Sequence, residues 1–346
     1  MKRLLMLLIL VAVLTTPVSA MEFTAPSAPS DALELMPAET ESFAQGLWTV
    51  IKSAIVKFAP DLTAAAGSCL GLTAVVLLAS LLNAMPGSSK KVIRFVTTLA
   101  LSTILLGQAN AMINLCAKTV REISDYGKLL LPVMTAALAA QGGTTGATAL
   151  YAGTALFDTV LSSIISNLLV PMVYVFLALS ASNSATGEDL LKKLRDFIKW
   201  LMTWSLKTIL YVFTGYMSIT GVITGTADAA AVKAAKLTIS GVVPVVGGIL
   251  SDASEAVILG AGLMKSAAGV YGLLAVAAIW ITPFLQIGAQ FLLLKLTAVL
   301  CGVFGVKEAS DLIEDFSSAM GLLLGMTGTV SFLMLISTIC FMKGMG

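Results

Sequence analysis

Apolar residues dominate six long stretches of this 346-residue chain, and polar residues gather in the segments between them. Each stretch is close to, or longer than, the ~20 residues that a helix needs to cross a bilayer. The pattern predicts an all-α, polytopic membrane protein. We expect about six transmembrane helices, at residues 68–85, 95–117, 149–181, 207–225, 267–300 and 317–342.

Two apolar segments between these spans are too short to cross a bilayer. Residues 129–140 end at Gly142 and Gly143, and residues 241–250 contain Pro244 with Gly247 and Gly248. Non-helical backbone at membrane depth is tolerated only where protein or water covers its polar groups. We expect both segments to be short re-entrant or broken helices.

Three further segments have the helical spacing of amphipathic surface helices. Residues 47–58 place apolar side chains opposite two lysines and predict a helix on the outer membrane surface. Residues 187–204 form a basic helix, which is either an elbow joining two halves of the bundle or a docking surface for a cytoplasmic partner. Residues 306–316 predict an acidic helix.

Four prolines suggest an internal duplication. Pro132 and Pro171 are 39 residues apart, as are Pro244 and Pro283, and the second pair follows the first by 112 residues. Pro171 and Pro283 lie in the two longest spans, where we expect a kink or a break. The copies would form a parallel repeat of residues 96–181 and 208–300. The alternative is chance, because proline is frequent in membrane helices.

The N-terminus has the pattern of a cleavable signal peptide, residues 1–20. Lys2 and Arg3 precede a short apolar core, and Ala20 closes a cleavage site of small residues. An uncleaved anchor is disfavoured because the apolar run is far shorter than a span. Residues 21–66 would then be an acidic extracytoplasmic tail and amphipathic helix, followed by a transmembrane helical domain at 67–346.

The predicted signal peptide indicates the orientation of the spans, because it places residue 21 outside the cytoplasm. The loop 86–95 falls on the cytoplasmic side, and its Lys90, Lys91 and Arg94 agree with the excess of positive charge found there. The basic segment after the third span also falls inside. The orientation of the last span is left open.

The composition narrows the function. The chain is 58% apolar and 12% charged, with a mean hydropathy of +0.96, so lipid is the expected solvent. A net charge of +2, carried by scattered residues, predicts no nucleic-acid partner. The chain has no histidine, four isolated cysteines and no nucleotide, zinc-protease or serine-hydrolase motif, so we expect neither an enzyme nor a cofactor or metal site.

Asp158 is the sharpest candidate for a functional side chain. It lies about ten residues into an apolar span, where an acid is costly unless it faces protein or water. Gln108 and Asn110 in the second span are more typical of polar contacts between helices than of a permeation path. Three Gly-x-x-x-Gly motifs permit close helix packing and self-association, at Gly67, Gly221 and Gly321.

One stretch carries a family resemblance. The run from Ser240 to Ala253, which includes Pro-Val-Val-Gly-Gly and Asp252, together with Pro132 and the preceding leucines, resembles the stage III sporulation protein AE family of endospore-forming bacteria. The order of features along the whole chain is similar to that family. No catalytic residues are carried over from it.

The resemblance implies a multispanning protein of the mother-cell membrane around the forespore. It implies a subunit of a secretion or feeding channel, with partners from the same operon that include a cytoplasmic ATPase and ring-forming proteins of the intermembrane space. The other hypothesis is a stand-alone secondary transporter in which Asp158 couples ion to solute. Pro132, Pro171, Pro244 and Pro283, with the glycines beside the short segments, are the candidate conduit or packing residues.

Overall fold

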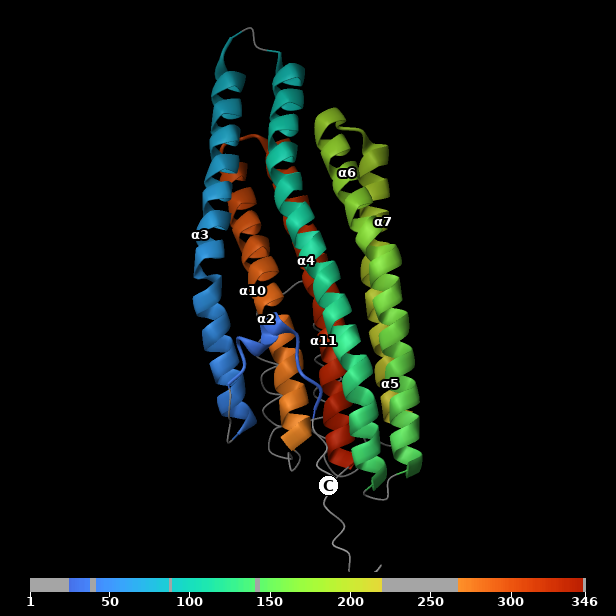
Figure 1. Cartoon of the computed structure of the whole chain (residues 1–346). Helices are drawn as coiled ribbons and strands as arrows, with labels where there is room; N and C mark the ends of the chain where they lie inside the picture. The colour runs from blue at the N-terminus through green and yellow to red at the C-terminus, as the bar shows by residue number, and fades with distance from the viewer. Residues whose placement is uncertain (1–24, 38–41, 87–88, 141–143, 220–266, 345–346) are drawn as a thin grey trace, which may run out of the picture.

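The structure is a computed structural model that describes residues 25–37, 42–86, 89–140, 144–219 and 267–344. All regular elements in these ranges are helices, and they form one elongated bundle (Figure 1). The elements are α2 (Ser30–Leu33), α3 (Phe43–Ala84), α4 (Lys90–Ala140), α5 (Thr144–Ile164), the π-helix η1 (Ile165–Leu169), α6 (Val170–Thr186), α7 (Asp189–Ile219), α10 (Ala267–Val303) and α11 (Lys307–Gly344).

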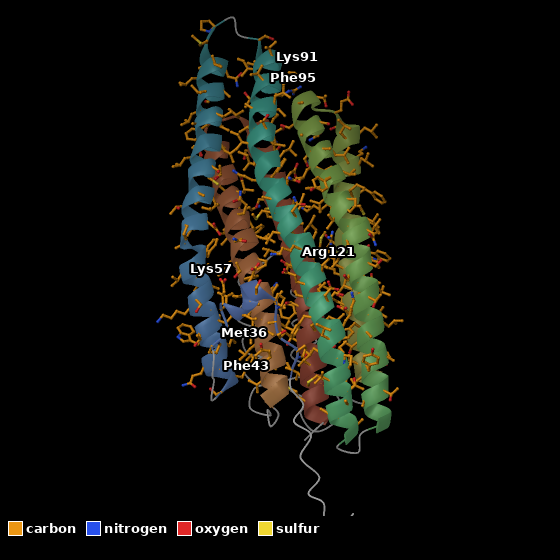
Figure 2. All side chains as sticks on the ribbon, in the orientation of Figure 1. Met36, Phe43, Lys57, Lys91, Phe95 and Arg121 are labelled. Carbon is orange, nitrogen blue, oxygen red and sulfur yellow. The ribbon has the colours of Figure 1, made fainter. Side chains whose placement is uncertain are left out.

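The long helices alternate in direction, so the loops after α3, α6 and α10 meet at one end of the bundle. Three contacts tie these loops together: Ser80 Oγ donates to Phe304 O at 2.9 Å, Arg94 to Thr186 O at 2.8 Å, and Ser184 Oγ to Glu308 O at 3.0 Å. Helices α4, α7 and α11 therefore run one way, and α3, α5–α6 and α10 run the other. Lys91 and Phe95 lie toward this end, and Phe43 toward the opposite end (Figure 2).

Within the described residues, five helical stretches are long and apolar enough to cross a membrane. They are Phe43–Ala84, Lys90–Ala139, Ala147–Thr186, Gly269–Val303 and Lys307–Met342. An all-helical membrane protein is thus confirmed. The predicted span at 207–225 is described only as far as Ile219, inside α7, and the number of six spans stays a prediction.

Helices α10 and α11 form the centre of the bundle. Within the most apolar window of each, 72% of the residues are buried, against 22–33% for the other three stretches. The outer side of α3 exposes leucines such as Leu70 and Leu78, and α10 exposes Leu296 and Val303 at the end where the loops meet. Apolar side chains that face outward in this way suit contact with lipid acyl chains.

Local sequence explains where several helices begin and end. Ser42 caps α3, because its hydroxyl accepts a hydrogen bond from the Gln45 N–H at 3.3 Å. Gly187 ends α6 with φ of 76°, and Gly305 closes the α10–α11 turn with φ of 75°. Only glycine adopts this left-handed backbone readily, so both turns depend on the missing side chain.

The structure differs from the expectation of separate surface and re-entrant helices. Residues 129–140 are the last turns of the continuous helix α4, not a broken segment. Residues 47–58 belong to α3, residues 189–204 to α7, and residues 307–316 to α11. Backbone hydrogen bonding is local and continues through a change of polarity, so hydropathy alone places these boundaries wrongly. The second short segment, 241–250, lies outside the described residues.

Prolines are accommodated inside the helices. Pro60, Pro132 and Pro283 lie within α3, α4 and α10, although each lacks the N–H that the helix would use. Before Pro171 the chain widens into the π-helix η1, the kind of local irregularity expected in this long span. Helix α6 continues from there without a turn.

Helices α5 and α7 approach closely where Gly153 faces Tyr216. A Cβ atom on Gly153 would overlap the Tyr216 ring at Cε1, while the Tyr216 hydroxyl donates to Ala149 O at 2.8 Å. Phe157 packs beside the same ring, with ring centroids 5.7 Å apart. The missing side chain of Gly153 therefore makes room for the tyrosine that joins the two helices.

We predict that Gly153→Ala lowers the free energy of unfolding in detergent by about 1–2 kcal/mol, because the overpacking cost exceeds the gain in helix propensity. Gly107→Ala on α4 is the matched control, since a Cβ atom at this position would meet no neighbouring helix or side chain within 4 Å. Thermal unfolding of both variants measures the effect. Equal stability of the two variants would show that the contact with Tyr216 is unimportant.

Candidate functional site

Asp158 is buried between helices, with 2% of its surface exposed. Ser124 Oγ on α4 donates to Asp158 Oδ2 at 2.7 Å, whereas Oδ1 has no hydrogen-bond partner among the described residues. One turn earlier on α5, Thr154 donates to Ser337 of α11 at 3.1 Å. These contacts form a small polar cluster inside the bundle.

The other sequence candidates do not gather around Asp158. Pro132 lies inside α4, Pro171 in the first turn of α6, and Pro283 inside α10. Gly142 and Gly143 lie outside the described residues, as do Pro244, Gly247, Gly248 and Asp252. Helices α4 and α7 run in the same direction, as a parallel repeat requires, but the repeat itself stays a prediction.

Amide side chains link α10 to its neighbours. The side-chain amide of Gln290 donates to the side-chain oxygen Oε1 of Gln108 on α4. Gln286, one turn earlier on α10, donates to Asp61 Oδ2 on α3 at 2.5 Å. Tyr174 OH on α6 donates to Asn110 Oδ1 at 2.8 Å. Gln108 and Asn110 therefore bond across helices, as polar side chains in membrane bundles commonly do.

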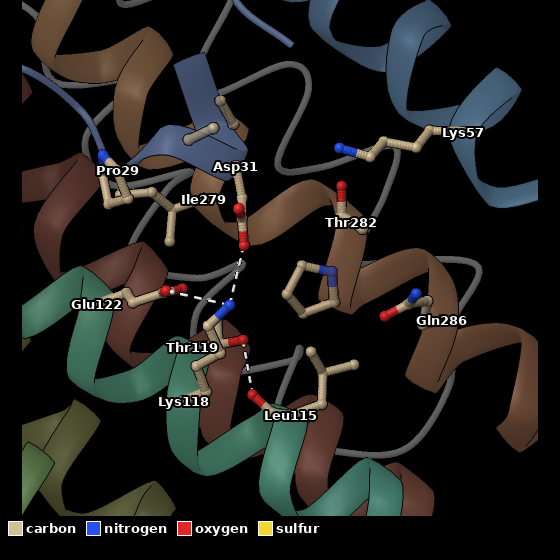
Figure 3. Close-up of a pocket in the computed structure, with 13 residues that line it drawn as sticks. Pro29, Asp31, Lys57, Leu115, Lys118, Thr119, Glu122, Ile279, Thr282 and Gln286 are labelled. Atoms are coloured by element: carbon tan, nitrogen blue, oxygen red, sulfur yellow. Dashed lines mark hydrogen bonds and ion pairs between the residues drawn. The ribbon is translucent and has the colours of Figure 1, made fainter. Parts of the chain in front are cut away.

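A pocket of about 200 Å³ lies beside Pro283, at the junction of α2, α3, α4 and α10 (Figure 3). Pro283 removes one helical donor here, so the Ile279 carbonyl loses its regular partner. Charged and polar side chains surround the space, in contrast to the apolar helix faces nearby. The polar lining residues are Asp31, Lys57, Lys118, Thr119, Glu122, Thr282 and Gln286.

Residues 25–37, called the strap below, cover this pocket. Asp31 accepts from Lys118 Nζ of α4 at 2.9 Å, and Glu34 accepts from Lys57 Nζ of α3 at 2.6 Å. Lys118 also lies 3.5 Å from Glu122, one turn along α4. This part of the acidic tail expected within residues 21–66 therefore docks on the bundle.

Sequence reasoning missed the strap and the pocket. The acids of the tail were visible, but their lysine partners are 23 and 87 residues away along the chain. One local signal was the i,i+4 pair of Lys118 and Glu122, which marks a charged turn of α4. Gln286 and Gln290, also one turn apart on α10, form a second signal for a polar face at this place.

Charged groups also join the helices near the end where the loops meet. Arg195 of α7 donates to Asp315 of α11 at 2.6 Å, and both side chains are largely buried. Lys199 donates to Ser318 Oγ at 3.0 Å, and Lys295 pairs with Glu314. Part of the basic segment 187–204 thus binds the acidic segment 306–316 within the same chain.

Taken together, the bundle and its polar interior define a multispanning helical membrane protein. A family model described as stage III sporulation protein AE matches residues 38–346. This chain belongs to that family, and the resemblance expected from residues 240–253 and Pro132 is confirmed. The family name is not that of an enzyme.

One curated relative extends the comparison. The stage III sporulation protein AE of Bacillus subtilis (strain 168) is 22% identical over 263 residues, which are 76% of this chain and 66% of the relative. The match therefore spans slightly less than two thirds of the relative's own length. No solved structure matches this chain.

We predict that Ser124→Ala lowers the free energy of unfolding by about 1–3 kcal/mol, because the buried Asp158 carboxyl loses its hydrogen-bond donor. The matched control is Thr159→Ala, which removes an exposed hydroxyl that bonds only to Ala155 O of its own helix. Thermal unfolding in detergent measures both changes. A Ser124→Ala variant as stable as Thr159→Ala would contradict a structural role for this hydrogen bond.

A second prediction concerns pH. The hydrogen bond from Lys118, with a smaller contribution from the charge of Lys57, lowers the pKa of Asp31. A lowered folded-state pKa stabilises docking above the ordinary aspartate pKa, and this contribution disappears as pH falls through the lowered value. A nitroxide attached at Ser27→Cys reports on the docking of the strap. Its mobility should therefore increase only at pH values below the ordinary pKa of an aspartate.

The Asp31→Asn substitution is the control for that titration. Without the carboxylate, the electron paramagnetic resonance spectrum of the Ser27 label should show no mobility step over the same interval. An identical step in Asp31→Asn would assign the pH dependence to another group.

Proposed function

We propose that this protein is a membrane subunit of a sporulation-specific secretion or feeding channel between the mother cell and the forespore. It would act after engulfment, in the mother-cell membrane that surrounds the forespore, and it would have no catalytic activity of its own. The observation that carries the proposal is membership of the stage III sporulation protein AE family over residues 38–346.

The bundle supports a role within the membrane. Its five apolar helical stretches are long enough to cross a bilayer, and the polar side chains of α4, α5, α10 and α11 face one another. Such interior contacts hold a helical subunit in one arrangement, which an assembly with fixed neighbours needs.

The two ends of the bundle suit different partners. Five exposed lysines lie in the first residues of α4, α7 and α11, at the end that we expect to face the cytoplasm: Lys90, Lys91, Lys192, Lys193 and Lys307. This end is our candidate surface for a cytoplasmic ATPase of the same operon. The opposite end, toward which Phe43 lies (Figure 2), would face the ring-forming proteins of the intermembrane space. Self-association of the chain is compatible with both contacts.

A second candidate function is a stand-alone secondary transporter. The buried Asp158 favours it, because its Oδ1 atom has no partner among the described residues and intramembrane acids often bind coupling ions. The two candidates differ in what the carboxylate must do. A channel subunit needs only the hydrogen bond from Ser124, which an amide accepts equally well, whereas a coupling site needs the charge.

We predict that deleting the gene blocks the formation of heat-resistant spores after engulfment and leaves vegetative growth normal. Complementation with the native gene should restore spores, and cross-linking in sporulating cells should recover the proposed partners. A deletion strain that sporulates at the native frequency would rule out the proposed function.

Complementation with Asp158→Asn separates the two candidates in the same strain. Spore formation by this variant supports the channel subunit. Loss of spores with normal amounts of the protein in the membrane would favour the transporter, because asparagine keeps the hydrogen-bond acceptor and removes only the charge.

A further inference from the structure

The strap binds the bundle through one narrow apolar face. Ala28, Ala32 and Leu35 are 5%, 2% and 3% exposed; Ala32 lies in α2, Ala28 in the segment before its N-cap Pro29, and Leu35 in the turn after it. Helix α2 within the strap packs on α10, in the space between α3 and α4 (Figure 1). The surface of α3, α4 and α10 that the strap covers is called the strap groove below.

The charged residues of the strap are divided between the two walls of the groove. Asp31 pairs with Lys118 on α4, and Glu34 pairs with Lys57 on α3. All four side chains are at least half exposed, so water screens both pairs and each contributes little to the fold. The pairs are better suited to selecting and orienting an acidic segment than to holding it permanently.

The strap does not fill the groove. The pocket of about 200 Å³ remains beside Ala32 and Pro283, with Thr119, Glu122 and Gln286 on its walls. Lys118 lies between Asp31 and Glu122, at 2.9 and 3.5 Å, so its ammonium group retains an acidic neighbour when Asp31 leaves (Figure 3). The groove therefore has room for a side chain larger than Ala32, and without the strap Lys57 loses its carboxylate partner while Lys118 keeps Glu122.

We infer that the strap groove is a docking site for a short acidic helical segment of an extracytoplasmic protein partner, and that residues 25–37 occupy it in cis. The groove selects two carboxylates three residues apart, which reach Lys118 and Lys57, and small apolar side chains on the adjoining face. An incoming segment displaces the strap and uses the remaining pocket. The inference is independent of the channel function, because the test uses the purified full-length chain.

The first measurement asks whether the strap leaves the groove. The native cysteines Cys69, Cys116, Cys301 and Cys340 are buried, so a new thiol at Ala32→Cys reports on the strap. Its reaction with a maleimide should be slow, and Asp31→Asn with Glu34→Gln should speed it by roughly three- to tenfold, the range that two exposed ion pairs supply. Ser27→Cys, on an exposed residue, is the control and should react at one rate in both backgrounds.

The second measurement uses a fluorescent peptide of residues 25–37 as the probe. Peptide binding, measured by anisotropy, should be strong for the full-length Asp31→Asn/Glu34→Gln chain and weak for the native chain, whose tethered strap competes at high effective concentration. Adding Lys57→Glu and Lys118→Glu to the weakened chain should abolish binding of this peptide. The same variant should bind a peptide that carries lysine at positions 31 and 34.

Each result decides the matter. The docking site is supported if the acidic peptide binds only when Lys57 and Lys118 are present and the lysine-bearing peptide binds only when both are replaced by glutamate. Two results would overturn it: an Ala32→Cys reaction rate that the strap substitutions do not change, which would make the strap a permanent part of the fold, or a released strap with no charge-dependent binding of either peptide.

Discussion

Backbone N–H and C=O groups that enter lipid must find partners within the protein, and the shape of this molecule follows from that constraint. The described chain meets it with long uninterrupted helices, up to the 51 residues of α4. Pro60, Pro132 and Pro283 each remove one donor, yet α3, α4 and α10 continue through them. The π-helix before Pro171 is the one place in the described residues where the irregularity becomes visible in the backbone.

The sequence therefore predicts which segments are helical far better than it predicts where helices end. The apolar spans and the helical class were clear from periodicity and length. The break expected before Gly142 was not found in residues 129–140, since a change of hydropathy alters the surroundings of a helix and not its hydrogen bonds. Gly187 and Gly305, by contrast, end helices through their own backbone preference, and such turns are readable from sequence.

Ion pairs between segments far apart in the sequence could not be predicted from hydropathy or local backbone preference. The basic segment 187–204 and the acidic segment 306–316 were each visible as charged helix faces, but only the fold brings Arg195 to Asp315. The acids of residues 25–37 likewise meet Lys57 and Lys118 only after α3 and α4 have packed. Charge periodicity indicates that a face will be polar, and tertiary packing decides whether water, lipid or another helix covers it.

The polar side chains inside the bundle fall into two groups with different consequences. Many threonines, such as Thr135 and Thr338, donate to the carbonyl four residues earlier in their own helix, which satisfies the hydroxyl without constraining a neighbour. Asp158 with Ser124, Gln290 with Gln108, and Arg195 with Asp315 bond across helices instead. In an apolar surrounding a helix could slide or rotate at little cost, because one leucine contact resembles another. These three links set the register of α4 against α5, of α4 against α10 and of α7 against α11, so the few polar residues of the spans specify an arrangement that the many apolar ones only permit.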